Sequence, residues 1–342
     1  MLARQDLRLE ASKGFNRDPA FLRAGSLATH AFITGGGGFL ANHLARDLLA
    51  QGHEVTVLMR RQAADGLPQK ARVVHGDLLL GPFPLIPPSA DVVYHLAAKS
   101  STVESVAAPA ETLEVNVMGT ARLLEEARAR PRKLRRFVLA STGQVYGPPF
   151  RGRLREAHPA VPRNPYSASK HAAETLAVAY DGLFDVPVTV LRLFNIYGPG
   201  QRAEYVIPSV LSQCIEQTAL KIGNPWPVRD FVFVDDAVAM FRLAGLDRKS
   251  RRQTVNVGTG EGVRVDRMVA LAVKVTGCGL KPAIESDRKR PNDFDRLVSD
   301  PSKARRLYRW RPQVSLEEGL RRTADALRAG ARARAEAGPG PV

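Results

Sequence analysis

Residues 34–41 read Thr34-Gly35-Gly36-Gly37-Gly38-Phe39-Leu40-Ala41. A short apolar run at residues 31–34 leads into this segment, and a helical pattern at residues 40–51 follows it. Glycines between a strand and a helix let backbone N–H groups approach a pyrophosphate at the helix N-terminus, whereas elsewhere they would form an ordinary tight turn. Ala41 replaces the last glycine of the fingerprint, at a position that serves helix packing. The segment therefore predicts a dinucleotide-binding turn.

Short apolar runs alternate with helical stretches along most of the chain. We expect strands at residues 31–34, 55–59, 72–75, 92–96, 137–141 and 188–193, and helices near residues 40–51, 112–130 and 168–180. This alternation is typical of an α/β protein with a Rossmann-type doubly wound parallel sheet. After about residue 195 the pattern loosens, which indicates a smaller C-terminal substrate-binding lobe over the carboxyl ends of the strands.

Four parts are expected along the chain. Residues 1–28 form a polar N-terminal extension, and residues 29–195 form the dinucleotide-binding Rossmann core. Residues 196–329 belong mainly to the substrate-binding lobe. The Ala/Arg-rich residues 330–342 are expected to be a disordered tail or a frayed helix.

Composition excludes several classes of protein. Cys214 and Cys278 are too few for a disulfide framework and lack metal-ligand spacing, so we expect inert packing residues, a reducing cytoplasmic location and no metal site. No apolar run of membrane-spanning length and no secretory leader is expected. The formal charge of +16 is spread along the chain without a nucleic-acid-binding signature. An anionic small substrate or an Arg-rich surface is therefore favoured over nucleic acid or a membrane as partner.

Tyr166-Ser167-Ala168-Ser169-Lys170 places a phenol and an ammonium four residues apart, on one face of a helix. The segment Ser141-Thr142-Gly143-Gln144-Val145-Tyr146-Gly147 ends a predicted strand before it. Together with the glycine turn, these segments resemble the extended short-chain dehydrogenase/reductases, and within them the nucleotide-sugar epimerase/dehydratase family. The resemblance spans about residues 31–319. Further matching motifs are His95-Leu96-Ala97-Ala98-Lys99-Ser100-Ser101, Asn116-Val117-Met118-Gly119-Thr120, Leu191-Arg192-Leu193-Phe194-Asn195-Ile196-Tyr197-Gly198-Pro199, Arg229-Asp230-Phe231, Val234-Asp235-Asp236, Asn256-Val257-Gly258 and Arg290-Pro291.

The resemblance implies a role for each matching residue. The catalytic residues would be Thr142, Tyr166 and Lys170. The cofactor would contact Gly35, Gly38, Phe39, Leu40, Arg60, Asp77, Leu78, Leu96, Ala97, Ala98 and Asn116 together with Tyr166 and Lys170. The substrate, a nucleoside-diphosphate sugar, would contact Lys99, Ser100, Thr142, Asn195, Arg229 and Arg290. The family also implies a homodimer joined through helices near residues 105–130 and 166–182.

Removal of a hydride from a sugar carbon requires a base for the hydroxyl proton, and a free tyrosine, with a pKa of about 10, is too weak an acid to be that base. We expect the Lys170 ammonium to lower the pKa of Tyr166 toward neutral. Thr142 would hold the same sugar oxygen. Taken one by one, these residues could be a core tyrosine, a snorkelling lysine and a capping threonine.

The second strand ends in Leu58-Met59-Arg60-Arg61, where an NAD enzyme usually has an acid for the ribose hydroxyl. An arginine there fits a 2′-phosphate, so NADP(H) is favoured as cofactor and NAD remains possible. The alternative is that both arginines are ordinary solvated side chains.

Several reactions remain open within the family. Dehydratases of the family have an acid just after the catalytic threonine, and Gly143 and Gln144 cannot supply one, which disfavours 4,6-dehydration. We favour a nucleoside-diphosphate-sugar 4-epimerase. The alternative is an NADPH-dependent reductase of 4-keto-6-deoxyhexoses, of the GDP-sugar type, because hydride transfer is common to both. An inactive sugar-nucleotide or dinucleotide sensor is a further possibility of a different class.

Overall fold

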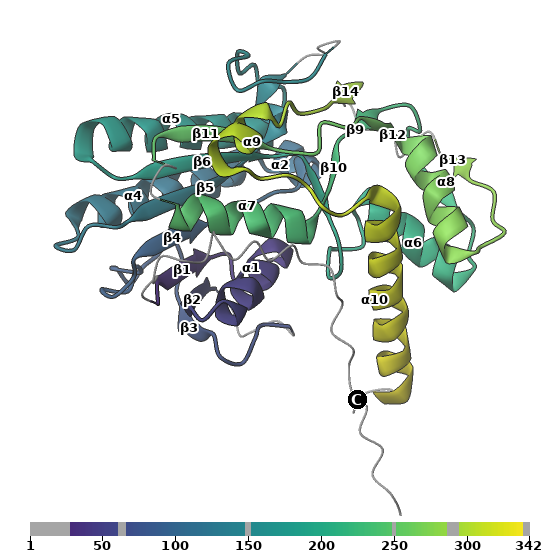
Figure 1. The fold of residues 1–342 in the computed structure, drawn as a ribbon, viewed down its shortest axis with the longest axis horizontal. Helices are drawn as coiled ribbons and strands as arrows, with labels where there is room; N and C mark the ends of the chain where they lie inside the picture. Colours follow the sequence, from purple (N-terminus) through teal and green to yellow (C-terminus); the bar gives the residue numbers. More distant parts are fainter. Residues whose placement is uncertain (1–27, 61–65, 148–151, 248–250, 286–293, 338–342) are drawn as a thin grey trace, which may run out of the picture.

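The structure is a computed structural model that describes residues 28–60, 66–147, 152–247, 251–285 and 294–337. At its centre lies a seven-stranded sheet in the order β11-β6-β5-β4-β1-β2-β3 (Figure 1). The strands are β1 (His30–Thr34), β2 (Glu54–Met59), β3 (Arg72–His75), β4 (Val92–His95), β5 (Arg136–Thr142), β6 (Val188–Leu193) and β11 (Gln253–Val257). Each neighbouring pair is parallel, so the predicted Rossmann-type doubly wound sheet is confirmed.

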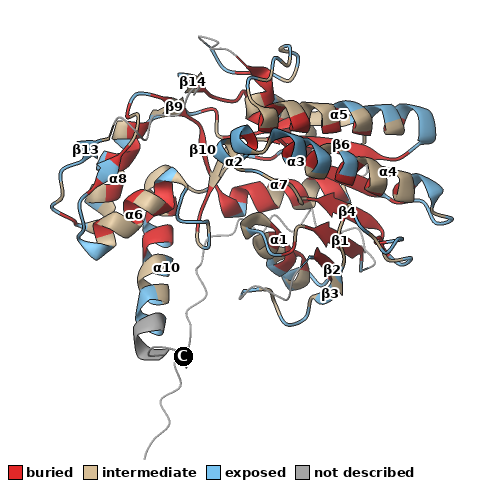
Figure 2. Cartoon of the chain, turned by 180° about the vertical axis from the view of Figure 1, so that it is seen from behind, coloured by how far each residue is buried: buried red, intermediate tan, exposed pale blue. Residues whose placement is uncertain are grey.

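Helices cover both faces of this sheet, which explains why its strands are apolar. Helices α1 (Phe39–Ala50) and α7 (Val234–Leu246) pack together on one face, and α4 (Gly119–Ala129) and α5 (Pro165–Phe184) pack on the other (Figure 1). Successive residues of β1 alternate between the two cores, with Phe32 in the α4/α5 core and Ile33 in the α1/α7 core. Figure 2 shows the buried strands between helices that expose their outer sides.

The strand order reverses between β1 and β4. Thr34, the last residue of β1, lies in register with His95, the last residue of β4. Open parallel sheets bind ligands outside the carboxyl ends of their strands at such a reversal. The fold therefore places the predicted glycine turn and the loop after β4 at the same ligand-binding edge.

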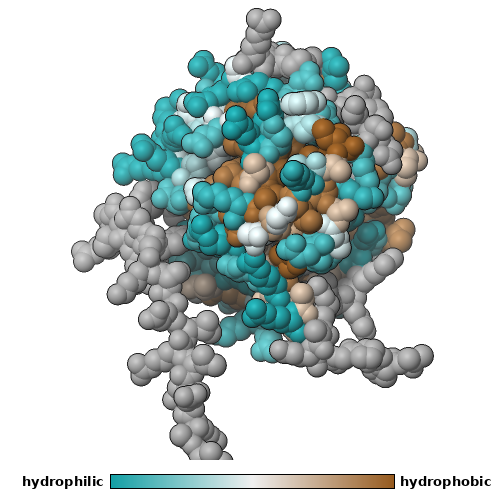
Figure 3. All heavy atoms as spheres, turned by 90° about the vertical axis from the view of Figure 1, so that its right-hand side faces the viewer, coloured by the Kyte–Doolittle hydropathy of each residue, from teal (hydrophilic) through white to brown (hydrophobic). Residues whose placement is uncertain are grey.

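The C-terminal lobe is built around α6 (Val206–Glu216), α8 (Val265–Thr276) and α10 (Leu316–Ala337). Its short strands are β7 (Asn195–Tyr197), β8 (Lys221–Ile222), β9 (Val228–Arg229), β10 (Phe231–Phe233), β12 (Val263–Arg264), β13 (Ala283–Ile284) and β14 (Arg296–Leu297). The apolar core of the lobe is continuous with the α1/α7 core of the sheet, and both Cys214 and Cys278 are buried in it, as predicted. Figure 3 views this end of the molecule and shows hydrophobic atoms gathered among hydrophilic ones. The lobe and the sheet therefore form one packed unit.

The chain after residue 195 contributes to the sheet as well as to the lobe. Within the segment assigned mainly to the lobe, β11 pairs with β6, α7 covers the sheet and α9 (Ser302–Tyr308) packs on β11. The chain returns to the sheet because β11 pairs with the open edge of β6 and buries Val255 and Val257 there. Of the two alternatives expected for the tail, residues 330–337 adopt the helix, because they continue α10 and Ala and Arg favour helix. Residues 338–342 and 1–27 lie outside the described part of the chain.

The helix predicted at residues 112–130 is interrupted. Helices α2 (Thr102–Ala107) and α3 (Pro109–Leu113) precede a π-helical segment, Glu114–Met118, which leads into α4. Asn116 lies inside the π-helical segment, where its Oδ1 accepts from the Lys99 N–H at 2.8 Å and its side-chain N–H donates to Ser169 Oγ at 2.9 Å. Such bulges occur frequently at functional sites. Here the bulge brings Asn116 between the loop after β4 and α5.

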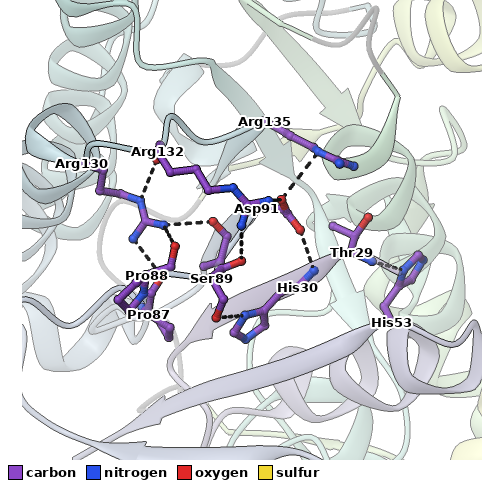
Figure 4. Close-up of polar contacts among 11 residues, drawn as sticks. Thr29, His30, His53, Pro87, Pro88, Ser89, Asp91, Arg130, Arg132 and Arg135 are labelled. Carbon is purple, nitrogen blue, oxygen red and sulfur yellow. Dashed lines mark hydrogen bonds and ion pairs between the residues drawn. The ribbon is translucent and has the colours of Figure 1, made fainter. Parts of the chain in front are cut away.

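A polar network closes the opposite, amino-terminal edge of the sheet (Figure 4). The Asp91 carboxylate accepts from the His30 backbone N–H at 3.0 Å and from Arg132 at 2.6 Å. Arg130 donates to the backbone carbonyls of residues 86, 87, 88 and 90, and a ring nitrogen of His30 lies 2.8 Å from Ser89 Oγ. Burial lowers the pKa of His30, so its ring is neutral at pH 7. These contacts satisfy buried polar groups far from the glycine turn, which indicates a structural role.

Close helix-to-sheet packing generates a first prediction. A Cβ at Gly245 of α7 would lie 2.1 Å from the hydroxyl of the buried Tyr94 on β4, whereas a Cβ at Gly182 of α5 would meet nothing within 4 Å. We expect Gly245→Ala to lower the free energy of unfolding by about 1–3 kcal/mol through overpacking. We expect the matched control, Gly182→Ala, to raise it by about 0.5–1 kcal/mol, because alanine stabilises a helix more than glycine. Urea unfolding of both variants measures this, and equal effects would contradict the packing described here.

Candidate active site

The glycine turn is closed by its neighbours. Gly35 has φ +79°, and a Cβ there would lie 2.9 Å from the backbone of Ala97 in the loop after β4. A Cβ at Gly36 would lie 1.9 Å from Val57 Cγ1, and the Gly36 N–H donates to Leu58 O at 3.0 Å. The turn therefore needs glycine at both positions, one for its left-handed backbone and both for the close approach of neighbouring strands.

Helix α1 begins directly at this turn. Gly38 is its N-cap residue, with no side chain to cap the helix and no acidic residue in the first turn. The first backbone N–H groups of a helix lack partners within the helix, and its dipole adds positive potential at this end. Phe39 and Leu40 thus begin a helix whose N-terminus suits the pyrophosphate of a dinucleotide.

The predicted adenosine end lies at the end of β2. Arg60 Nη1 lies 3.9 Å from Asp77 Oδ2, and the Arg60 side chain is 70% exposed. Asp77 Oδ1 accepts from the Leu79 N–H at 2.7 Å. The side chain of Leu78 is buried and packs beside Gly119. Arg60 and Asp77 are therefore adjacent. Both can thus contact the adenosine end of the same dinucleotide. Arg61 lies outside the described residues.

A chain of directed hydrogen bonds runs through the buried His95. The Thr120 hydroxyl donates to Asn116 O at 2.6 Å, so Thr120 Oγ1 accepts from His95 Nε2 at 2.9 Å. His95 Nδ1 is then an acceptor for the Thr34 hydroxyl at 2.8 Å, and Thr34 Oγ1 accepts from the Ala97 N–H at 3.1 Å. Burial and the Lys170 charge lower the pKa of His95 to about 3, which keeps the ring neutral. The chain joins β1, β4 and the start of α4.

Helix α5 positions the predicted catalytic residues. Asn164 caps it, accepting from the Ser167 N–H at 2.8 Å, and Pro165 occupies its first turn. Tyr166 therefore lies at the very start of the helix, and Lys170 one turn later. The Thr142 hydroxyl, at the end of β5, hydrogen-bonds Tyr166, and Lys170 Nζ donates to Ala140 O at 2.9 Å. The structure thus brings Thr142, Tyr166 and Lys170 together at the carboxyl end of β5.

The expected lowering of the pKa of Tyr166 is wrong for this arrangement. Burial raises the pKa of the phenol, and the hydrogen bond with Thr142 only partly opposes this. Lys170 is also buried, which lowers its own pKa to about 8 despite the Glu174 carboxylate. Desolvation thus outweighs the expected effect of the ammonium on the phenol.

A buried ion pair lies one helical turn beyond Lys170. Glu174 accepts from Arg192 Nη2 at 2.7 Å and from Arg192 Nε at 3.0 Å, and the guanidinium lies 4.7 Å above the ring of Tyr146. Burial alone would raise the pKa of Glu174, but the hydrogen bonds and the charge of Arg192 hold it below its usual value. The pair joins α5 to β6 beneath the catalytic residues.

Comparison with known proteins identifies the family. The sequence model of a family described as GDP-mannose 4,6 dehydratase matches residues 85–323. A UDP-glucose 4-epimerase from Mycolicibacterium smegmatis is 34% identical over 315 residues, which cover 86% of this chain and 97% of that protein. The chain belongs to the extended short-chain dehydrogenase/reductases. Within them it belongs to the nucleotide-sugar epimerase/dehydratase family, so the predicted enzyme class is confirmed.

Solved structures of this dehydrogenase/reductase family support the same assignment. UDP-glucose 4-epimerase from Thermotoga maritima, solved with UDP-glucose, has a TM-score of 0.82 at 27% identity and covers 89% of this chain and 100% of its own. UDP-glucuronic acid 4-epimerase from Bacillus cereus, solved with UDP-glucuronic acid and NAD, has a TM-score of 0.81 at 27% identity, covering 88% of this chain and 99% of its own. The Rossmann-type sheet and the nicotinamide dinucleotide predicted from the sequence are thus properties of the family.

The predicted substrate residues have different surroundings. Asn195 begins β7, and its buried Oδ1 has no hydrogen-bond partner among the described residues. Arg229 is buried, and its Nη1 donates to Phe294 O at 2.6 Å. Lys99 Nζ lies 2.5 Å from the Glu111 carboxylate, so its charge is already neutralised. Arg290 lies outside the described residues. Asn195 is therefore the best supported substrate contact of these four.

No acid follows Thr142, the predicted catalytic threonine. A Cβ at Gly143 would lie 3.0 Å from the ring of the buried Phe194, so the position has little room for a side chain. Gln144 Oε1 accepts from Asn164 Nδ2 at 3.2 Å and from the Thr102 hydroxyl at 3.5 Å. The Gln144 amide is thus held in place, and it cannot act as a general acid or base.

Two features of this site were not predicted from the sequence. Glu174 follows Lys170 by four residues, and Arg192 interrupts an otherwise apolar strand, so a charge within a buried strand was the available signal. Tyr205, on the loop before α6, has its hydroxyl 3.4 Å from Ser100 Oγ, and no local pattern indicates this contact.

The glycine turn generates a second prediction. We expect Gly36→Ala to weaken NADPH binding by roughly tenfold or more and to lower the melting temperature, because its Cβ displaces the turn from Val57 and the helix N-terminus. The matched control is Gly37→Ala, whose Cβ would lie 3.8 Å from Met59 Cε, an ordinary contact. Fluorescence titration with NADPH compares the two. Equal affinities in both variants would show that residues 35–38 do not hold the dinucleotide.

Proposed function

We propose that this enzyme is a nucleoside-diphosphate-hexose 4-epimerase. The observation that supports this most strongly is the convergence of Thr142, Tyr166 and Lys170 beside the glycine turn at the carboxyl edge of the sheet. A site with one acid–base phenol and a reversible hydride acceptor can oxidise C4 and reduce it again from the other face. Such a reaction consumes no net reductant.

Tyr166, Lys170 and Thr142 have different roles in the proposed reaction. Tyr166 takes the proton of the C4 hydroxyl while the C4 hydride leaves, and it returns the proton when the hydride comes back. A nicotinamide dinucleotide held at the glycine turn would supply the reversible hydride acceptor, and the positive charge of its oxidised form would favour the phenolate. Lys170, with a pKa lowered to about 8 by burial, still carries its charge at neutral pH. Thr142 holds the sugar oxygen, so the phenol and the reacting bond stay aligned.

The neutral pair Gly143 and Gln144 disfavours chemistry beyond hydride transfer. Elimination of water across the sugar needs an acid or base besides Tyr166, and neither residue can provide one. Introducing an acid at residue 143 would require Phe194 to move. An intermediate ketone in this site therefore returns by reduction and does not lose water, which supports the epimerase over the dehydratase.

We propose a uridine diphosphate sugar as substrate, on the names of the relatives alone. UDP-glucose 4-epimerase and UDP-glucuronate 4-epimerase are both among the related proteins. The buried, unpartnered Oδ1 of Asn195 and the buried Arg229 at the lobe supply polar groups for the nucleotide or diphosphate. Arg290 stays a prediction.

As cofactor we propose NADP(H) in preference to NAD. At the end of β2 the position of the usual acid is taken by the buried Met59, which cannot bond a ribose hydroxyl. The largely exposed Arg60 can reach a 2′-phosphate, and Asp77, at 3.9 Å, neutralises it only in part. Two structural relatives were solved with NAD. We therefore propose the preference for NADP(H) for this chain alone, on the basis of Met59 and Arg60.

A second candidate, reduction of a 4-keto-6-deoxyhexose by NADPH, is favoured by one observation, the arginine at residue 60. A reductase releases its oxidised cofactor after each turnover, whereas an epimerase keeps it. The catalytic residues would be the same for both.

We also propose a homodimer. Exposed apolar side chains gather on α2, on the α3–π segment and on α5, namely Val103, Val106, Leu113, Met118, Val178 and Leu183. Apolar groups on adjoining helices of one face favour a protein contact.

Among the described residues, no helix is both long and apolar enough to span a membrane. The cytoplasmic location and the absence of a nucleic-acid partner stay predictions.

The epimerase proposal is tested with UDP-galactose that has deuterium at C4. We expect interconversion with UDP-glucose, deuterium retained at C4 and no net oxidation of NADPH. We expect Tyr166→Phe to lower kcat by about 10²–10⁴-fold, because the general base is removed, with NADPH affinity unchanged as the internal control. Stoichiometric NADPH oxidation by a 4-keto sugar, without interconversion, would establish the reductase instead. A Tyr166→Phe variant without catalysis that keeps full biological function in the cell would support the sensor.

The cofactor proposal is tested at Arg60. We expect Arg60→Ala to weaken NADPH binding by roughly tenfold and to leave NADH binding unchanged, because one charge-assisted contact to phosphate is lost. Arg72→Ala is the matched control, since Arg72 is similarly exposed but begins β3 at the opposite edge of the sheet. An equal loss for both dinucleotides, or none, would contradict the preference for NADP(H).

A further inference from the structure

A tyrosine on the lobe lies beside the catalytic phenol. Tyr205 precedes α6, and its hydroxyl lies 3.4 Å from Ser100 Oγ in the loop after β4. Tyr205 is also close enough to Tyr166 to raise the pKa of that phenol. Three hydroxyl groups, from Ser100, Tyr166 and Tyr205, therefore converge from the loop after β4, α5 and the lobe.

The loop that carries Tyr205 is fixed at several points. His43 Nε2 lies 2.8 Å from Pro199 O, and Gln201 Nε2 donates to Ile196 O at 2.8 Å. The Tyr205 N–H donates to Arg202 O at 3.2 Å, which closes a turn. A phenol on a loop held in this way is preorganised, so it loses little freedom when a ligand binds.

The same loop is tied to the sheet side of the site by an ion pair. Arg202 Nη2 lies 3.2 Å from Glu104 Oε1 on α2, next to the segment that contains Ser100. Together with the Tyr205–Ser100 contact, this bond joins the lobe to the Rossmann core across the site. The distance between the two hydroxyls is therefore set by both parts of the fold.

The two hydroxyls are open to a ligand. Ser100 is exposed and Tyr205 is half-buried. Their contact of 3.4 Å is long for hydroxyl groups, which prefer about 2.7–2.8 Å, so each can bond a closer partner. A sugar whose reacting carbon lies against Tyr166 would place another of its hydroxyls near this pair.

We propose that Tyr205 is a substrate-contacting residue that selects the hexose through a hydroxyl other than the one oxidised. Its phenol and Ser100 hydrogen-bond that hydroxyl, and a sugar that lacks it leaves the phenol unpaired. The inference rests on the proposed epimerase function. It adds a specificity determinant to the site, because a polar group placed to bond a hydroxyl rejects analogues without it.

The test compares UDP-galactose with its 3-deoxy and 6-deoxy analogues in the wild type and in Tyr205→Phe. We expect the wild type to favour UDP-galactose over one of the two analogues by about 3- to 10-fold in kcat/KM, which corresponds to one neutral hydrogen bond. Tyr205→Phe should lose this preference for that analogue alone. UDP, which lacks the hexose, should bind both proteins equally. Tyr180→Phe, which removes a phenol from the outer part of α5, should keep the wild-type preference.

The outcomes separate the two proposals. A wild type that interconverts no UDP-hexose overturns the epimerase, and direct binding of the three sugar nucleotides still measures the preference that Tyr205 is proposed to give. Unchanged preferences in Tyr205→Phe overturn the role of Tyr205 while the epimerase stands. A loss of UDP affinity in Tyr205→Phe also overturns it, since the residue would then act through the structure of the lobe.

Discussion

The neutral imidazole of His95 holds the ligand-binding edge of the sheet together. With its Nε2 protonated, it donates to Thr120 and accepts from Thr34, so the ends of β1 and β4 and the start of α4 lie within one hydrogen-bond chain. A proton added to Nδ1 would meet the Thr34 hydroxyl proton and reverse the chain. Burial and the charge of Lys170 prevent this by lowering the pKa of His95 to about 3. The glycine turn and Asn116 are thus positioned by one uncharged ring.

Beneath the catalytic residues, charge is arranged in buried layers. Lys170 is desolvated and donates a hydrogen bond to the Ala140 carbonyl, while Glu174 and Arg192 neutralise one another one turn deeper. A buried ion pair adds little net stability, but removing one partner leaves the other charge unpaired. The pair therefore constrains α5 against β6, and with it the position of Tyr166. The protein itself raises the pKa of Tyr166, so a further positive charge is needed to form its phenolate.

The lobe decides what can happen to a sugar held at this edge. Its core is continuous with that of the sheet, so loops from both parts keep fixed positions. Phe194 excludes a side chain at Gly143, and Thr102 and Asn164 hold the Gln144 amide. This arrangement supports the proposed chemistry, which is proton and hydride transfer at one carbon. Selection among sugars then depends on contacts such as that of Tyr205.

The sequence by itself determined the parallel sheet, the glycine turn and the Tyr166–Lys170 pair, because each follows from local periodicity or spacing within one strand or helix. Only the tertiary structure decided that β11 returns to the sheet, that Glu174 pairs with Arg192 and that Tyr205 reaches Ser100. Those contacts join residues distant along the chain, up to 105 positions apart for the last pair. The pKa of Tyr166 was mispredicted for the same reason: desolvation is set by everything that surrounds a group, and spacing along a helix does not contain it.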